Sequence, residues 1–311
     1  MGRSPDAQAV GHAHTRRMPE LSVNGVSLYY EERGTGASIL CIHGTGSSSA
    51  LWRDAAVELA THGRTIVYDR RGFGRSERPE PFVTDVHQHA DDAAELLDAL
   101  GATPAIVIGR SQGGEIAVDL ALRHPDIVRA LALLEGGGFS LSEEFKRWEA
   151  ELSERVFAAG EADMSTVAET MFRGVLGDAG WDSMPEPAKQ VLVANGPAIV
   201  AEHRGGLLDL TVEELATIDK PTLLVAGNDS PSEFADVTRL MAKAIPSASV
   251  EWVDGGHLIN PAHPAVLAFV GGALEDTRGA GGRISTAPGF SQAPSAGAAK
   301  RGGTRLKPGT G

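Results

Sequence analysis

Short apolar runs and amphipathic stretches alternate along most of the chain. The apolar runs predict strands, and the stretches with apolar residues three or four positions apart predict helices. Asn24-Gly25 predicts a hairpin turn, Gly101 closes a helix, and Pro125 stops another. The predicted strands are Leu21–Val23, Val26–Glu31, Ser38–Ile42, Thr65–Tyr68, Ala105–Ile108, Val128–Leu134, Thr222–Ala226 and Ser249–Val253. The predicted helices are Ala50–Ala60, Val86–Leu100, Gln112–Arg123, Glu233–Ala244 and Pro264–Leu274.

One long stretch interrupts this alternation. Residues 139–217 are acidic and have helical spacing, with no clear strand. Strands that alternate with helices predict a mostly parallel sheet covered on both faces. The sequence therefore predicts an α/β core of residues 20–138 and 218–275, with a helical insertion over one edge of the sheet.

The two ends of the chain lack any such pattern. Residues 1–19 are polar, and residues 276–311 are rich in Gly, Ala, Pro and Ser with scattered Arg and Lys. Such segments bury too little apolar surface to offset the entropy of ordering them. We therefore predict a disordered tail at each end. Patterned sequence begins directly after Met18, which we expect as an alternative start.

Composition narrows the classes of partner. The 311 residues carry a net charge of −13, which disfavours phosphate backbones and anionic lipid surfaces. No apolar run approaches the length of a membrane span, and the single cysteine, Cys41, excludes an internal disulfide. We predict a cytoplasmic protein that acts on a small molecule, with neither a nucleic acid nor a membrane as partner. The oligomeric state is left open.

The stretch Gly109-Arg110-Ser111-Gln112-Gly113 stands between a predicted strand and a predicted helix. A turn this sharp forces its central residue into a strained backbone conformation, and the flanking glycines avoid collisions. The turn lifts the Ser111 hydroxyl above the amino end of the helix. The amide of Gln112 then points to where an oxyanion would form.

Three further loops follow predicted strands. In His43-Gly44-Thr45-Gly46 the glycines let the backbone approach a ligand, so the Thr45 amide is a candidate second oxyanion donor. Residues 69–76 read DRRGFGRS. Gly255-Gly256-His257 follows the last strand, from which the histidine can reach Ser111.

These motifs, in this order, closely resemble those of the α/β-hydrolase family. The shared features are His-Gly, D-x-R-G-x-G-x-S, G-x-S-x-G and a late Gly-His, and the resemblance spans about residues 20–275. It implies Ser111 as nucleophile, His257 as base, Thr45 and Gln112 as oxyanion hole, and residues 139–217 as a cap. Candidate pocket residues in that cap are Phe145, Trp148, Phe157, Met171, Phe172, Trp181 and Met184.

The acid that orients the histidine has two candidates. The family often has an aspartate three residues after the glycine that ends the seventh strand, but here that position is Ser230, and Asp229 stands one residue earlier. Haloalkane dehalogenases and certain lactonases of the family instead use an acid at the end of the sixth strand, where this chain has Glu135. A glutamate at the end of a buried strand is costly unless it is paired or used. We therefore favour Glu135, with Asp229 as the alternative.

The expected function is that of a cofactor-independent serine hydrolase that cleaves a small apolar carboxylic ester or lactone through an acyl-enzyme. No histidine pair or cysteine cluster predicts a metal, and no G-x-G-x-x-G follows the first strand. Alternatives within the fold are a perhydrolase similar to haloperoxidases, a carbon–carbon bond hydrolase and a non-catalytic ligand-binding member. Dehalogenases and epoxide hydrolases are disfavoured, because these relatives carry Asp where this chain has Ser111.

Overall fold

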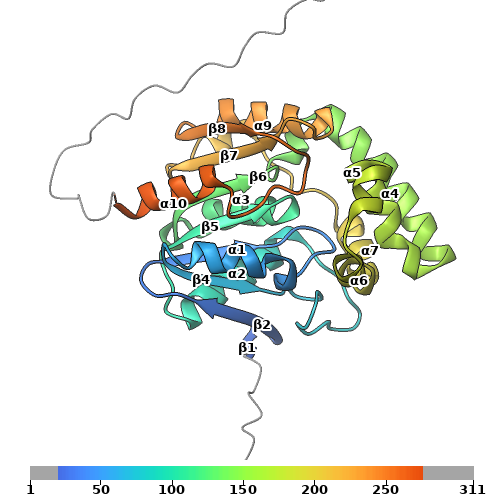
Figure 1. Ribbon diagram of the computed structural model, residues 1–311, viewed down its shortest axis with the longest axis horizontal. Coiled ribbons are helices and arrows are strands. Elements are labelled where there is room, and N and C mark those ends of the chain that lie inside the picture. Colours follow the sequence, from blue (N-terminus) through green and yellow to red (C-terminus); the bar gives the residue numbers. More distant parts are fainter. Residues whose placement is uncertain (1–19, 276–311) are drawn as a thin grey trace, which may run out of the picture.

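The computed structural model describes residues 20–275, so both predicted tails lie outside the described residues. Eight strands form one sheet in the order β1-β2-β4-β3-β5-β6-β7-β8. Figure 1 shows this sheet with β1 and β2 at one end and β7 and β8 at the other. β2 is antiparallel to both β1 and β4, and all other pairs are parallel. The predicted eight-stranded, mostly parallel sheet is therefore confirmed. The strands are β1 (Glu20–Val23), β2 (Val26–Arg33), β3 (Ser38–Ile42), β4 (Arg64–Tyr68), β5 (Ala105–Arg110), β6 (Val128–Leu134), β7 (Thr222–Gly227) and β8 (Ala248–Val253).

Helices cover both faces of the sheet. Apolar residues of α1 and α10 pack in one core cluster, and those of α2, α3 and α9 pack in the other. The helices of the α/β core are α1 (Arg53–Leu59), α2 (Val86–Ala99), α3 (Gln112–Arg123), α9 (Ser232–Ala244) and α10 (Pro264–Glu275), with 3-10 turns η1 (Ser49–Trp52) and η2 (Pro125–Ile127).

The central strands are buried on both faces, which is why they read as unbroken apolar runs. Every residue of β3 and β5 is buried. Leu40 and Val107 enter one core cluster, while their neighbours Ile39 and Ile106 enter the other. Burying each such side chain contributes about 1.5–3 kcal/mol. These buried strands therefore give rigid support to the loops that continue from their ends.

The sheet register brings the ends of three strands level. Ile42 at the end of β3 pairs with Gly109 of β5, and Arg110 at the end of β5 pairs with Leu134 at the end of β6. The chain segments that continue from these strands therefore leave the sheet at one edge, where parallel sheets commonly bind ligands.

Several elements differ from the prediction at their ends, and β5, for example, continues two residues beyond Ile108 to Arg110. β2 continues two residues beyond Glu31, because Glu32 and Arg33 pair with β4 despite their charge. The predicted helix over residues 50–60 is divided into η1 and α1, because the hydroxyl of Ser48 caps a 3-10 turn by accepting a hydrogen bond from the Ala50 amide.

Between β6 and β7 the chain is helical. α4 packs against α5 and α7, and Figure 1 shows α4 to α7 gathered at one side of the sheet. This segment contains η3 (Phe139–Leu141), α4 (Glu143–Ala162), η4 (Met164–Thr166), α5 (Val167–Ser183), α6 (Glu186–Ala194), α7 (Gly196–Gly205) and α8 (Val212–Leu215). No helix within residues 20–275 is both long enough and apolar enough to span a membrane.

Candidate active site

Ser111 forms the turn between β5 and α3. Its backbone has φ 53° and ψ −125°, a conformation that L-residues rarely adopt. The turn is anchored on both sides, because the Ser111 amide donates to the Leu134 carbonyl at 3.0 Å and the Ser111 carbonyl accepts from the Gly114 amide at 2.7 Å. The strained turn predicted from the sequence is present.

The glycines around Ser111 lie so close to other backbone atoms that no side chain fits there. A Cβ on Gly109 would lie 2.3 Å from the Gly113 carbonyl oxygen, as the sequence argument expects. A Cβ on Gly113 would instead lie 2.2 Å from the Ile42 oxygen and 2.8 Å from the His43 oxygen. Gly113 is therefore required by the end of β3, a contact that the motif alone does not reveal.

We expect Gly113→Ala to lower the free energy of unfolding by about 3 kcal/mol, because the backbone atoms that the methyl group would meet cannot move aside. Gly272→Ala is the matched control, since nothing lies within 4 Å of a Cβ there and α10 gains a better helix former. Urea unfolding of both variants is the measurement. Equal stability of the two variants would contradict the packing described for Gly113.

His257 and Glu135 form a buried pair. His257 Nδ1 lies 2.8 Å from Glu135 Oε2, and the two side chains are 5% and 0% exposed. The carboxylate also accepts hydrogen bonds from the Gly227 amide at 2.6 Å, on Oε1, and from the Ser230 hydroxyl at 2.8 Å, on Oε2. These donors offset the cost of burying the charge. A carboxylate at Nδ1 holds the proton there, which leaves Nε2 of the neutral ring free to accept one.

The alternative acid, Asp229, is placed differently. It is exposed, and among residues 20–275 no hydrogen bond joins its side chain to His257. Its amide donates to the Gly255 carbonyl at 3.0 Å. The structure thus brings together Glu135 and His257, with Ser230 as a donor to Glu135.

Thr45 and Gln112 both border the space beside Ser111. Gly44 runs so close to the turn that a Cβ on it would lie 3.1 Å from Ser111 Cβ. Gln112 is the first residue of α3, where backbone amides have no acceptor within the helix. The loop and the helix terminus therefore flank Ser111, as the oxyanion-hole prediction requires.

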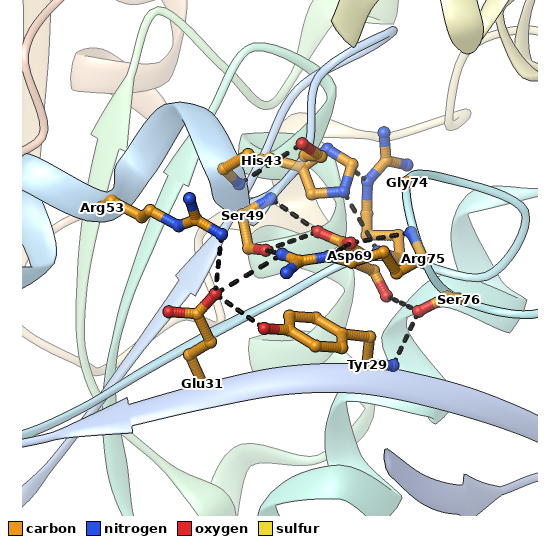
Figure 2. Close-up of polar contacts among 12 residues, drawn as sticks. Tyr29, Glu31, His43, Ser49, Arg53, Asp69, Gly74, Arg75 and Ser76 are labelled. Atoms are coloured by element: carbon orange, nitrogen blue, oxygen red, sulfur yellow. Dashed lines mark hydrogen bonds and ion pairs between the residues drawn. The ribbon is translucent and has the colours of Figure 1, made fainter. Parts of the chain in front are cut away.

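The DRRGFGRS motif is joined by hydrogen bonds to the end of this loop, and Figure 2 shows Asp69 between Ser49 and Arg75. The buried Asp69 accepts hydrogen bonds from the amide and hydroxyl of Ser49 at 2.7 and 2.6 Å. Its second oxygen accepts from the amide and Nε of Arg75 at 2.9 and 3.2 Å. Gly74 is required because a Cβ there would lie 2.4 Å from Asp69 Oδ2. The motif is thus a support for the loop after β3, a role that its spacing alone does not reveal.

His43 and Arg70 also hold the loop that follows β3. His43 is fully buried, and burial together with the Arg70 charge holds the pKa of its imidazole well below the usual range. The neutral ring accepts from the Arg70 amide at 3.0 Å through Nε2, and Nδ1 lies 2.9 Å from the Gly44 oxygen. The Arg70 guanidinium binds Gly44 O at 3.1 Å and pairs with Glu202 of α7. The loop is therefore tied to the helical insertion.

Asn195, between α6 and α7, makes the same connection. Its amide nitrogen donates to the carbonyls of Gly46 and Ser47 at 2.9 and 3.0 Å, and its oxygen accepts from the Gly74 amide at 3.0 Å. Sequence reasoning did not single out Asn195. Nothing in its neighbourhood along the chain indicates a contact nearly 150 residues away.

Arg110 was also missed as a site residue. It is buried beneath the turn, and burial lowers its pKa to about 10. Nη1 donates to the Ile259 carbonyl at 3.3 Å. Because Ile259 lies two residues after His257, this bond ties the loop that carries the histidine to the end of β5.

A cavity of about 230 Å³ has Ser111 and His257 in its wall. The rest of the wall is mainly apolar, and much of it comes from the helical insertion. Leu258, which is 45% exposed, belongs to this wall and also to the surface. We call this cavity the large chamber. Its apolar residues from the insertion are Met171, Phe172, Val175, Met184, Pro185, Ala188 and Leu192.

A second space of about 40 Å³, the small chamber, also borders Ser111. Phe139 and Phe145 stack in its wall with ring centroids 4.4 Å apart. Phe234, also in this wall, packs on the His257 ring at 4.2 Å. Of the seven predicted pocket residues, Met171, Phe172 and Met184 line the large chamber, and Phe145, Trp148 and Met171 line the small one. Phe157 and Trp181 line neither.

A family model described as alpha/beta hydrolase fold matches residues 37–264. The chain therefore belongs to this family. It is 31% identical over 258 residues to a protein of Azorhizobium caulinodans named as a candidate carbamate hydrolase, RutD, covering 80% of this chain and 95% of that one. The 2-(acetamidomethylene)succinate hydrolase of Mesorhizobium japonicum is 27% identical over 276 residues, covering 83% and 94%.

Solved structures of other enzymes are similar to this fold over most of the chain. Est816, described as an N-acyl homoserine lactone degrading enzyme, has a TM-score of 0.64 and 26% identity, covering 83% of this chain and 99% of its own. A hydrolase from Pseudomonas aeruginosa PA01 has a TM-score of 0.69 and 26% identity, covering 85% and 99%. The family resemblance predicted from the motifs is confirmed.

Proposed function

We propose that this protein is a serine hydrolase that cleaves a carboxylic ester or lactone through an acyl-enzyme. The observation that carries the proposal is the buried Glu135–His257 pair beside a strained serine at the wall of an apolar cavity. Such an arrangement supplies a nucleophile, a base and a group that orients the base. The names of the lactone-degrading enzyme and of the 2-(acetamidomethylene)succinate hydrolase support the hydrolysis of a compound that contains a carbonyl group.

In this mechanism Ser111 attacks the carbonyl carbon while His257 accepts the hydroxyl proton. The negative oxygen of the tetrahedral intermediate is bound by the amides of Thr45 and Gln112. His257 then donates its proton to the departing alcohol, and water activated by the same histidine releases the acid. No metal or cofactor takes part, and a cytoplasmic location is part of the proposal.

The position of the base that protonates the leaving group indicates which part of the substrate each chamber binds. The leaving oxygen must lie next to His257, since that residue protonates it. His257 lines the large chamber and does not line the small one, whose wall includes Phe234, packed on the His257 ring at 4.2 Å. The alcohol part therefore occupies the large apolar chamber, and the acyl part occupies the small one. The favoured substrate combines a short acyl group with a bulky apolar alcohol.

We expect kcat/KM to be highest for acetyl to butyryl esters and to fall at least about tenfold for an octanoyl ester of the same alcohol, because the small chamber, of about 40 Å³, leaves little room for a long acyl chain. p-Nitrophenyl esters of graded acyl length provide the measurement. A matched series of acetates with alcohols of growing size should show the opposite trend. A preference for long acyl groups would reverse the assignment of the chambers.

A further inference from the structure

The small chamber has one polar end, built by the helical insertion. His203 of α7 and Glu149 of α4 both line it. His203 Nδ1 lies 2.9 Å from Glu149 Oε1 and 2.8 Å from the Ser153 hydroxyl. The insertion thus carries a second histidine–glutamate pair, which faces the same serine and has no role in the mechanism above.

The other ring nitrogen of His203, Nε2, has no hydrogen-bond partner in the part of the chain that the structure describes. The side chain is 4% exposed, and its Nε2 is buried without a hydrogen bond to any group among residues 20–275. A buried polar atom left unpaired costs about 1–3 kcal/mol, so such atoms usually meet a ligand or a solvent molecule. Most other walls of the chamber are aromatic or aliphatic, including Phe145, Leu152 and Leu207.

The surrounding charges decide which polar group fits. Glu149 faces the ring, and its carboxylate adds to burial in raising the pKa of Glu115, one turn after Ser111. Glu202 is a further neighbour, paired with Arg70. A substrate anion in the small chamber would meet repulsion from the Glu149 carboxylate, which lines it. A hydroxyl suits the position, because it can donate to Nε2 of a neutral ring or accept from a protonated one.

We propose that His203 Nε2 binds a hydroxyl group on the acyl part of the substrate, so that the preferred substrates are esters of short α- or β-hydroxy acids. This inference rests on the proposed function. The small chamber, of about 40 Å³, has much less room than the large one, which places the hydroxyl one or two carbons from the carbonyl. Glu149 and Ser153 are positioning residues, since they hold the His203 ring through Nδ1.

The test compares benzyl lactate with benzyl propionate, and benzyl β-hydroxybutyrate with benzyl butyrate. Each rate is divided by the rate of alkaline hydrolysis of the same ester, which removes intrinsic reactivity. We expect kcat/KM of the wild-type protein to favour the hydroxy ester at least about tenfold in one pair or both. His203→Phe should reduce this ratio to about one, because the hydroxy ester loses a hydrogen bond that the unsubstituted ester never makes.

Two further variants separate binding from folding. His203→Gln keeps a polar group at this position and should retain part of the preference. His62→Phe, at an exposed histidine outside both chambers, is the matched control and should retain all of it. If His203→Phe does not fold, the wild-type ratio and His203→Gln decide the question.

The outcomes are distinguishable. A ratio near one in the wild-type protein, with the unsubstituted esters hydrolysed, overturns this inference and leaves the proposed hydrolase standing. An equal loss on both members of a pair in folded His203→Phe or His203→Gln also overturns it. Failure to hydrolyse any ester, together with failure of a phosphonate to label Ser111, overturns the proposed function and the inference with it.

Discussion

Ser111→Ala is expected to lower ester hydrolysis by about 10³-fold or more, because no other group in the site replaces the nucleophile. The free energy of unfolding should change little. The side chain makes no capping hydrogen bond to α3, and alanine fits the same turn. Initial rates on a short-chain ester and urea unfolding are the two measurements.

A reactive phosphonate supplies the control for this experiment. It should label the wild-type protein at Ser111 in a stoichiometric reaction and leave Ser111→Ala unlabelled. Retained activity in a folded Ser111→Ala protein would remove Ser111 from the mechanism. An unlabelled wild-type protein would favour a non-catalytic ligand-binding member of the fold.

The second large effect is expected at the acid. Glu135→Gln keeps the size of the side chain but loses the charge that stabilises the imidazolium, and it permits the wrong imidazole tautomer. By analogy with other triads, kcat should fall by up to about 10⁴-fold. The cause lies in the pairing of Glu135 Oε2 with His257 Nδ1 at 2.8 Å.

Asp229→Asn is the matched control for that variant. The Asp229 side chain is exposed, so its loss should cost about tenfold or less, through disturbance of the loop alone. Both variants are compared on one substrate, with circular dichroism to verify folding. If Asp229→Asn loses its activity while Glu135→Gln keeps nearly all of it, the acid is Asp229.

The eight-stranded, mostly parallel sheet could be predicted because each strand has its own apolar run, and strands that alternate with helices can form few topologies. The turn at Ser111 could be predicted because its glycines lie close together in the sequence. Glu135 could be favoured on physical grounds, since a carboxylate at the end of a buried strand needs a donor. The structure supplies three such donors: His257, Gly227 and Ser230.

The helical insertion could not be resolved in this way. Its pattern predicts helices but says nothing about which faces meet, so the pairing of His203 with Glu149, 54 positions earlier, left no signal. The same holds for Asn195, whose partners lie on the loop after β3. Long-range contacts of polar side chains depend on how helices are placed, and periodicity does not contain that information. The catalytic roles of Ser111, His257, Glu135, Thr45 and Gln112 stay predictions until the variants are measured.

The Ser230 hydroxyl and the His257 ring both meet the same oxygen of Glu135, each at 2.8 Å. The ends of β6 and β7 therefore converge on one point in space, and a carboxylate from either strand can serve the same histidine. Two carboxylates there at once would repel each other. Each position thus limits the other: an acid on one strand requires a small, uncharged donor on its neighbour. In evolutionary terms the acid can change strands within this fold while the histidine and the nucleophile keep their places, provided that both positions change together.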